Sequence, residues 1–271
     1  MPELPEVETT RRGIEPYLKN RIVKSVTIRN PRLRWPIPKT LAKNLLGQQI
    51  YSVKRRAKYL LIKTTAGTLI LHLGMSGSLR ISAIGTAYRK HDHFALTLSN
   101  KKELRLHDPR RFGAVLWTDG DVNQHPLFVS LGPEPLEEPF NSDYLYHSNK
   151  NRTVSIKQHI MNSKIVVGVG NIYASEALFL AGIHPKRAAK RISKARIERL
   201  VDSIKSVLAD SIEQGGTTLR DFVRENGEPG YFAQHLNVYG KTGEPCPHCD
   251  KIIKQIVLGQ RSTYYCPNCQ R

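Results

Sequence analysis

The sequence predicts an α+β protein built of several domains, and three observations support this prediction. Short β-favouring runs separated by turn residues occupy residues 22–118, whereas apolar residues recur with a helical period from about residue 155. The last 35 residues are basic and contain all four cysteines. A length of 271 residues corresponds to about two domains, and an apolar fraction of 39% excludes general disorder.

The composition is strongly basic. Lys and Arg number 42 against 23 Asp and Glu, which gives a formal net charge of +19 and an isoelectric point near 9.9. This surplus favours a polyanionic partner, with an anionic membrane surface as the second choice. No apolar run reaches the roughly 18 residues of a spanning helix, and the acidic start lacks the apolar core of a secretory signal. We therefore expect a cytoplasmic protein without a membrane partner.

The first element is expected to be a helix over Pro5–Leu18. Proline suits a first helical turn because its missing N–H would be unpaired there. Glu6 and Glu8 follow near the positive end of the helix dipole. A rough apolar face is formed by Leu4, Val7, Ile14 and Leu18.

Eight short β-favouring runs follow this helix, separated by glycine, asparagine, proline or charged turns. Many short strands in sequence predict a sandwich or a barrel. The runs are Ile22–Ile28, Gln49–Lys54, Tyr59–Thr64, Thr68–Leu73, Ser78–Ile81, His93–Leu98, Glu103–Leu106 and Ala114–Trp117.

A proline- and glycine-rich stretch over residues 119–142 is the best candidate for a linker. Helices are expected over Ser155–Asn162 and Ile172–Ala181, and a third from a Ser193 cap to a stop at Gly215–Gly216. The polar stretch Thr217–Gln234 is expected to be a loop. We predict a β domain over residues 1–130, a hinge over 131–150, a helical domain over 151–234 and a small terminal domain over 237–271.

The cysteines form two knuckles, Cys246-x2-Cys249 and Cys266-x2-Cys269, with 16 residues between them. This spacing is typical of a tetrahedral zinc site on a β-hairpin, and four thiolates leave no open position, so the metal would be structural. A redox pair or two local disulfides are the alternatives. Arg261 would lie near the hairpin tip, either to meet a phosphate or as a solvated surface cation.

The amino terminus offers a possible nucleophile. If Met1 is removed, Pro2 carries a secondary amine, and an N-terminal amine has a pKa of about 7.7–8.0. Attack of that amine on a sugar aldehyde carbon would give a charged iminium, which promotes β-elimination. The neighbouring Glu3 could move protons. The simpler interpretation is that these residues only lead into the helix.

Several motifs, in order along the whole chain, closely resemble those of bacterial formamidopyrimidine-DNA glycosylases. The resemblance implies an N-terminal β-sandwich with an N-terminal helix, a helix–two-turn–helix domain and a β-hairpin zinc finger holding one structural Zn²⁺. It also implies excision of 8-oxoguanine and formamidopyrimidines from duplex DNA, followed by strand cleavage at the abasic site through β,δ-elimination. The matching motifs are Met1–Thr9, Arg55–Leu61, His72–Leu79, Lys90–His93, Asp108–Gly113, Val167–Glu176, Gln214–Leu219 and the four cysteines.

The resemblance implies roles for four catalytic residues. Pro2 matches the Schiff-base nucleophile that attacks C1′, and Glu3 matches the proton donor that helps to open the sugar. Lys58 matches the proton donor assigned to β-elimination, and Arg261 the one assigned to δ-elimination. Each position is identified by its motif in this sequence.

The resemblance also implies a set of DNA contacts. Met75, Arg110 and Phe112 match the side chains that fill the duplex after a damaged base is flipped out, a step that apolar wedges support by bending DNA. In isolation each is more simply a core or surface residue. Other matched DNA contacts are His91, Arg152, Lys157 and Asn171, and relatives often have lysine at position 152.

Some assignments stay open at this point. His72 could reach a phosphate or be a half-buried strand histidine. Glu6 could support the active site or only stabilise the helix dipole, and Glu176 could bridge to the amino-terminal arm. Residues 217–231 should form the loop that closes over the flipped base.

Two other functions compete with this interpretation. Related endonuclease VIII enzymes favour oxidised pyrimidines, but Leu4 and the Met75, Arg110 and Phe112 set point away from them. A non-catalytic zinc-finger DNA-binding protein is disfavoured by intact Pro2, Glu3 and Lys58. We expect a monomer whose partner is double-stranded DNA containing oxidised purines.

Overall fold

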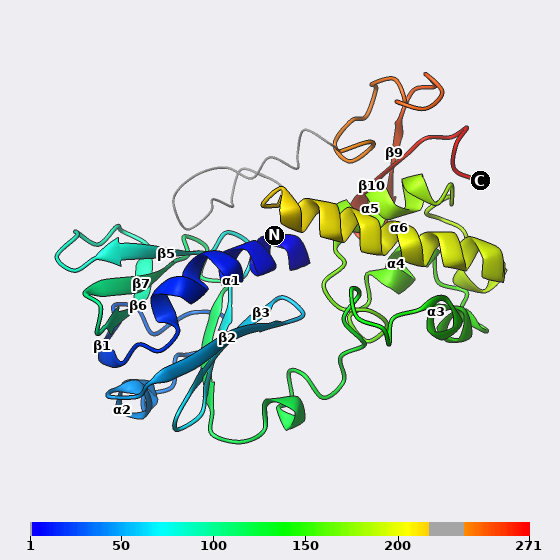
Figure 1. Ribbon diagram of the computed structural model, residues 1–271. Coiled ribbons are helices and arrows are strands. Elements are labelled where there is room, and N and C mark those ends of the chain that lie inside the picture. Colours follow the sequence, from blue (N-terminus) through cyan, green and yellow to red (C-terminus); the bar gives the residue numbers. More distant parts are fainter. Residues whose placement is uncertain (1, 217–235) are drawn as a thin grey trace. The chain divides into compact units, whose positions relative to one another are not determined.

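The computed structural model describes residues 2–216 and 236–271. The described chain forms two compact units (Figure 1). Unit 1 contains residues 2–129 and 214–216, and unit 2 contains residues 130–213 and 236–271. Each unit is described by itself below.

Unit 1 is a pair of antiparallel four-stranded sheets, with strand orders β1-β6-β7-β5 and β2-β3-β4-β8. All eight predicted strands are confirmed, and no end differs from its prediction by more than two residues. Their bounds are β1 Val23–Ile28, β2 Ile50–Arg56, β3 Tyr59–Thr64, β4 Thr68–His72, β5 Ser78–Ala83, β6 Asp92–Leu98, β7 Lys102–His107 and β8 Ala114–Thr118.

The core of unit 1 lies between the two sheets, as expected for a sandwich. Leu60 and Ile62 of β3 pack in one buried cluster with Leu96 of β6 and Leu104 of β7. Along β3 these buried positions alternate with more exposed ones, which is the period of a strand with one face in the core. The sandwich prediction is therefore confirmed.

Helix α1 (Leu4–Leu18) confirms the predicted first element and buries Val7, Ile14 and Leu18 in the same core. Pro5 lies in its first turn. Glu3 and Glu6 form a capping box, in which the Glu3 backbone N–H donates to Glu6 Oε2 at 2.8 Å. This arrangement provides acceptors for backbone N–H groups that have no partner within the first helical turn. It therefore fixes the orientation of the Glu3 backbone at the start of the helix.

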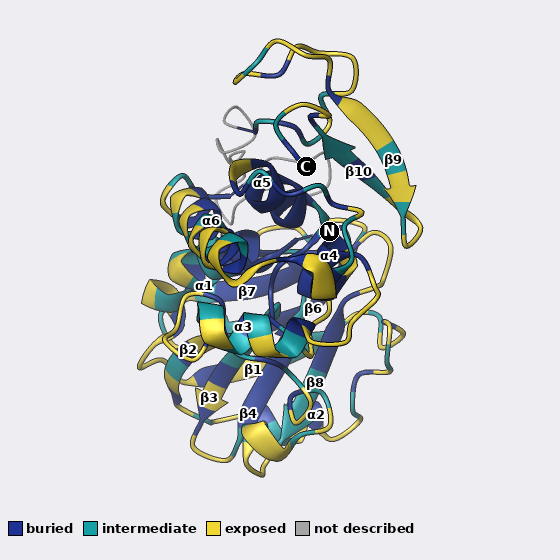
Figure 2. Cartoon of the chain, turned by 90° about the vertical axis from the view of Figure 1, so that its right-hand side faces the viewer, coloured by how far each residue is buried: buried dark blue, intermediate teal, exposed yellow. Residues whose placement is uncertain are grey.

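Unit 2 is built from helices and a terminal hairpin: α3 (Ser142–Asn149), α4 (Ile156–Ile160), α5 (Asn171–Leu180), α6 (Lys194–Glu213), β9 (Lys254–Leu258) and β10 (Arg261–Tyr265). Nearly all of α5 is buried, whereas α6 has one apolar face, and Figure 2 shows this contrast. Two 3-10 turns complete the described chain, Val122–Gln124 in unit 1 and Ala189–Arg191 in unit 2. No helix in the described part of the chain is long and apolar enough to cross a membrane.

Two helices were not predicted. Helix α2 (Leu41–Leu45) is a single five-residue turn that packs against β1. Helix α3 lies inside the stretch predicted as a hinge, where Asn141 caps it by accepting the Tyr144 backbone N–H, and it packs against α6. Its apolar periodicity is weak over eight residues, so tertiary packing rather than sequence pattern stabilises it.

Candidate functional site

The two described residues before helix α1 are buried. Pro2 and Glu3 are both buried, and Glu3 is the N-cap residue of α1. Glu6 is also buried and holds the Glu3 backbone through the capping box. Glu6 therefore positions Glu3, the residue next to the candidate nucleophile Pro2. This contact is separate from any effect of Glu6 on the helix dipole.

Lys58 lies in the two-residue turn between β2 and β3, where Ala57 has a positive φ of 53°. This turn is tied to α1 through Arg55. The Arg55 guanidinium contacts Glu8 Oε2 at 3.2 Å and donates to the Ala57 carbonyl at 2.9 Å. Helix α1 and the Lys58 turn are thus parts of one hydrogen-bonded arrangement.

His72, at the end of β4, is neutral at physiological pH. Burial, together with the positive charges of Lys58 and Arg34, lowers its pKa to about 4. Its Nδ1 accepts the Gly74 backbone N–H at 3.0 Å, and its ring packs against Tyr59 with centroids 4.7 Å apart. The remaining nitrogen, Nε2, carries the proton of the neutral ring and can donate a hydrogen bond.

The predicted void-filling residues occupy two neighbouring turns of unit 1. Phe112 is 44% exposed, which rejects the alternative that it is a core residue. The exposed Arg110 has its guanidinium 5.0 Å from the centroid of the Phe112 ring. Met75 is half-buried in the turn after β4. The loop with Phe112 therefore presents a large apolar ring and a cation side by side.

His91 precedes β6 and is held by its neighbours. Its ring lies 6.1 Å from that of His93 and 5.8 Å from that of His107. The adjacent Asp92 is buried and contacts the Arg80 guanidinium, His107 Nδ1 at 3.0 Å and the Arg89 backbone N–H at 2.8 Å. This buried charged cluster, which sequence patterns did not predict, orders the segment that carries His91.

In unit 2, Lys157 and Asn171 meet at the zinc hairpin. The Lys157 ammonium donates to Asn171 Oδ1 at 2.7 Å, Thr263 Oγ1 at 2.8 Å and the Ser262 carbonyl at 3.4 Å. Asn171 also donates to the Ser262 carbonyl, at 2.9 Å. Lys157 is only 1% exposed, so its first role is to join α4 and α5 to the hairpin.

Arg152 and Arg261 are both exposed. Arg261 begins β10 and pairs with Leu258 across a two-residue turn, as predicted for a residue at the hairpin tip. Because the Lys157 cluster holds the next two residues of β10, Arg261 projects from a fixed backbone. A rigid position suits a residue that must meet a phosphate.

The four cysteines form the predicted metal site. All their Sγ atoms lie within 4.8 Å of one another, with Cys246–Cys269 at 3.8 Å and Cys249–Cys266 at 3.5 Å. Sulfur ligands about 2.3 Å from a central zinc would be separated by distances of this size in a tetrahedron. The donors thus fit one structural Zn²⁺, and the site has no position left for a substrate.

Glu176, on α5, forms hydrogen bonds with the chain just before the zinc finger. Its carboxylate accepts the backbone N–H groups of Asn237, Val238 and Tyr239 at 2.7–2.9 Å, and the Asn237 side-chain amide at 3.0 Å. Glu176 is 1% exposed. It therefore anchors the chain that leads into the zinc finger. The expected lesion-capping loop over residues 217–231 lies outside the described residues.

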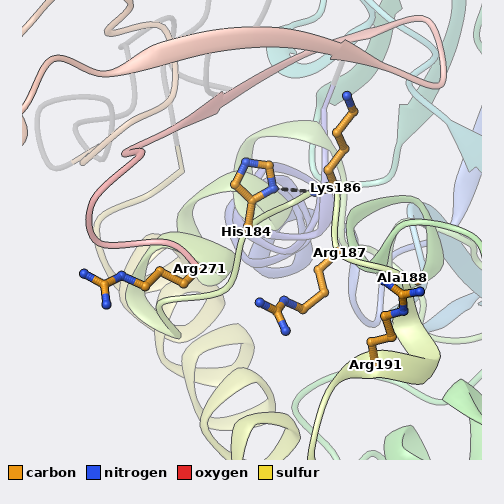
Figure 3. Close-up of a pocket in the computed structure, with 6 residues that line it drawn as sticks. All are labelled: His184, Lys186, Arg187, Ala188, Arg191 and Arg271. Carbon is orange, nitrogen blue, oxygen red and sulfur yellow. Dashed lines mark hydrogen bonds between the residues drawn. The ribbon is translucent and has the colours of Figure 1, made fainter.

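A basic hollow of about 500 Å³ adds to the positive surface of unit 2 (Figure 3). Among the described residues that line it, none is acidic. The His184 ring accepts the Lys186 backbone N–H at 3.2 Å, and burial and the charges of Lys186 and Arg187 lower its pKa. The lining residues are His184, Lys186, Arg187, Ala188, Arg191 and Arg271.

Comparison with known families assigns almost every segment described above. A family model for the formamidopyrimidine-DNA glycosylase N-terminal domain matches residues 1–115, and one for the H2TH domain of the same enzymes matches residues 131–223. A zinc-finger model found in these glycosylases and in IleRS matches residues 243–271. The chain belongs to the formamidopyrimidine-DNA glycosylase family. H2TH stands for the helix–two-turn–helix domain predicted above.

Individual relatives agree with this family assignment. The formamidopyrimidine-DNA glycosylase of Thioalkalivibrio sulfidiphilus is 63% identical over 100% of both chains, and that of Nitrosococcus oceani is 55% identical over 100% of both. The MutM (Fpg) structure from Thermus thermophilus has a TM-score of 0.89 at 36% identity, covering 99% of this chain and 98% of that one. A Lactococcus lactis Fpg structure with abasic-site DNA has a TM-score of 0.91 at 34% identity, covering 99% of both.

Proposed function

We propose that this formamidopyrimidine-DNA glycosylase removes oxidised purines from duplex DNA in base excision repair and then cleaves the resulting abasic site. The exposed Phe112 carries the proposal, because a large apolar ring beside a cation on a basic protein fits between DNA bases. Two solved Lactococcus lactis Fpg relatives hold DNA with a Fapy-dG or an abasic site.

Base excision begins when the damaged nucleotide leaves the stack, at a cost of a few kcal/mol. Phe112 would separate neighbouring bases, Met75 would occupy the vacated space, and Arg110 would hydrogen-bond the unpaired cytosine. The Pro2 nitrogen then attacks C1′ and a new C–N bond forms. The base leaves with the electron pair of its bond to C1′ and takes up the proton that the Pro2 amine gives up. Glu3 would donate a proton to the sugar ring oxygen as the ring opens.

Strand cleavage follows from the iminium that links Pro2 to C1′. The positive nitrogen acidifies the C2′ hydrogen, so loss of that proton expels the 3′ phosphate in β-elimination. A second elimination expels the 5′ phosphate, and water then releases the amine. Lys58 and Arg261 would supply protons in the two eliminations. His72 interacts electrostatically with Lys58. Because His72 is neutral, it adds no second positive charge beside Lys58.

The other predicted contact residues would bind the DNA backbone. His91 in unit 1, and Arg152, Asn171 and Lys157 in unit 2, would contact phosphates or order residues that do so. The basic hollow around His184 would add attraction for the polyanion without reading sequence. We further propose that the chain divides as predicted into a β domain, a hinge, a helical domain and a zinc finger, over residues 1–130, 131–150, 151–234 and 237–271. The protein would act on DNA as a monomer in the cytoplasm.

Borohydride trapping tests this proposal. Wild-type protein mixed with an 8-oxoguanine duplex and borohydride should form a covalent adduct, which mass spectrometry should locate at Pro2. Pro2→Gly keeps a primary amine and should react more slowly, whereas protein that retains Met1 should give no adduct. An adduct at Lys58, or none with wild type, would reject the assignment. Duplexes with an oxidised pyrimidine test the endonuclease VIII alternative.

A further inference from the structure

Asp108 is a buried carboxylate of unit 1. It follows β7 directly, begins the loop that carries Arg110 and Phe112, and is 0% exposed. Its Oδ2 accepts the Gly113 backbone N–H at 2.7 Å, which closes this loop at its far end. Its Oδ1 accepts the Ser76 hydroxyl at 3.4 Å, from the turn that carries Met75.

The backbone of Asp108 joins a third segment. Its N–H donates to the His91 carbonyl at 2.9 Å, and its carbonyl accepts His93 Nε2 at 2.9 Å. His91 is one of the predicted DNA contacts. Asp108 is therefore hydrogen-bonded to the Met75 turn, the His91 segment and the Phe112 loop at the same time.

Two glycines show how closely these segments pack. Gly74 has a φ of 67°, and a Cβ there would lie 2.4 Å from the Phe112 carbonyl carbon and 2.5 Å from the Gly113 nitrogen. A Cβ at Gly113 would lie 2.8 Å from the His72 carbonyl oxygen and 2.9 Å from Asp108 Oδ2. The Met75 turn and the Phe112 loop thus touch backbone to backbone, so a shift of one displaces the other.

We propose that Asp108 is a positioning residue that holds Met75, His91 and the Arg110–Phe112 loop as one rigid group. The inference rests on the proposed function, in which Met75, Arg110 and Phe112 fill the duplex together. A side chain that inserts between bases must keep its position against the stacked bases. The Asp108 carboxylate accepts hydrogen bonds from both turns at once and so holds them together. Asp108 touches neither the sugar nor the base in this scheme.

Three test substitutions and one control separate a positioning role from an effect on stability. Asp108→Ala removes both acceptors and leaves the Gly113 N–H unpaired. Asp108→Asn keeps one oxygen that can accept the Gly113 N–H, and its amide group can donate to the Ser76 hydroxyl. Ser76→Ala removes only the longer bond. Glu103→Gln is the matched control, because Glu103 is a buried carboxylate of β7 that pairs with Arg105 and not with the two turns.

Single-turnover rates on an 8-oxoguanine duplex and on a preformed abasic duplex are the first measurement. Asp108→Ala should slow excision by about 10-fold to 100-fold, the effect of a buried donor without its acceptor. Cleavage of the abasic site, which needs less base extrusion, should change by about threefold or less. Asp108→Asn should recover most of the excision rate, Ser76→Ala should show a small selective loss, and Glu103→Gln should show no selective loss even if its unfolding temperature falls.

Coupling to Phe112 is the second measurement. If Asp108 acts through the wedge, adding Asp108→Ala to Phe112→Ala should cost about twofold or less in excision, because neighbouring residues that act together are not additive. A 2-aminopurine beside the lesion should show reduced unstacking in Asp108→Ala. Equal losses on both duplexes, additive losses in the double variant, or unchanged 2-aminopurine fluorescence would overturn the proposal.

The outcomes also separate this inference from the proposed function. If wild-type protein does not excise 8-oxoguanine, the proposed function fails. If wild type excises it and Phe112→Ala loses excision selectively, but Asp108→Ala does not, only the positioning role fails. If Asp108→Ala does not fold, Ser76→Ala decides the question, and full excision with unchanged 2-aminopurine fluorescence in that variant would refute the proposal.

Discussion

The Lys157 ammonium donates a hydrogen bond to the Thr263 hydroxyl at 2.8 Å and so joins helix α4 to strand β10 of the zinc hairpin. Both residues are buried, with exposed fractions of 1% and 0%. Because Arg261 lies two residues before Thr263, this bond fixes the backbone from which Arg261 projects.

Replacing Lys157 by methionine should loosen the zinc hairpin. The change leaves the oxygens of Asn171 and Thr263 without their donor, at a cost of about 1–3 kcal/mol. We expect faster loss of zinc to a chelator and weaker DNA binding, measured by a colorimetric zinc indicator and by fluorescence anisotropy. Lys164→Met, at an exposed lysine of the same unit, is the control. An unchanged rate of zinc loss in Lys157→Met would contradict this role.

Glu176→Gln should release the chain before the zinc finger. Glutamine keeps one oxygen but presents an amide group to two of the donors that the carboxylate satisfies. Backbone N–H groups of residues 237–239 should exchange with deuterium about 10-fold to 100-fold faster, the effect of a lost buried bond. Glu213→Gln, at an exposed end of α6, should leave this exchange unchanged. Equal protection in both variants would reject the anchor.

DNA affinity should depend strongly on salt. For B-DNA the slope of log affinity against log salt is about −0.9 per neutralised phosphate. With roughly four to six contacts, affinity should fall by about two to three decades between 50 and 200 mM salt. Arg152→Ala and Arg261→Ala should each make the slope shallower by about one, whereas Lys43→Ala, on helix α2, should not. A nearly flat response of the wild type would exclude a phosphate-dominated interface.

The stability of unit 2 should fall as the pH falls from about 6.5 to about 4. Burial and the charge of Arg152 lower the pKa of His159 from 6.5 to about 4. In this window the unfolded chain binds a proton that the folded chain does not, so acid favours unfolding by up to about 3 kcal/mol.

His159→Gln should reduce that slope in urea titrations at several pH values. Its partner, the Ser148 hydroxyl at 3.1 Å, can bond to glutamine instead. His147→Gln, at an exposed position of α3, provides the comparison. If both variants keep the wild-type pH dependence, the buried His159 is not its source.

Much of the fold and of the chemistry could be predicted from the sequence, because both follow local rules. The alternation in β3 and the apolar stripe of α6 specify a strand and an amphipathic helix within a few residues. The cysteine spacing predicted a metal site that the Sγ distances confirm. The predicted roles of Pro2 and Glu3 rest on the chemistry of an N-terminal amine and on a family motif.

The packing of whole elements determines which side chains hold these residues in place. Lys157 lies 106 positions from Thr263, and Glu176 lies 62 from Val238. No periodicity relates residues so far apart, because their contact depends on how whole elements pack. Asp108 looks like any loop aspartate in the sequence. Its proposed role appears only when folding removes it from water, because a buried carboxylate must find donors, and its donors lie on the turn that carries Met75 and on the loop that carries Phe112.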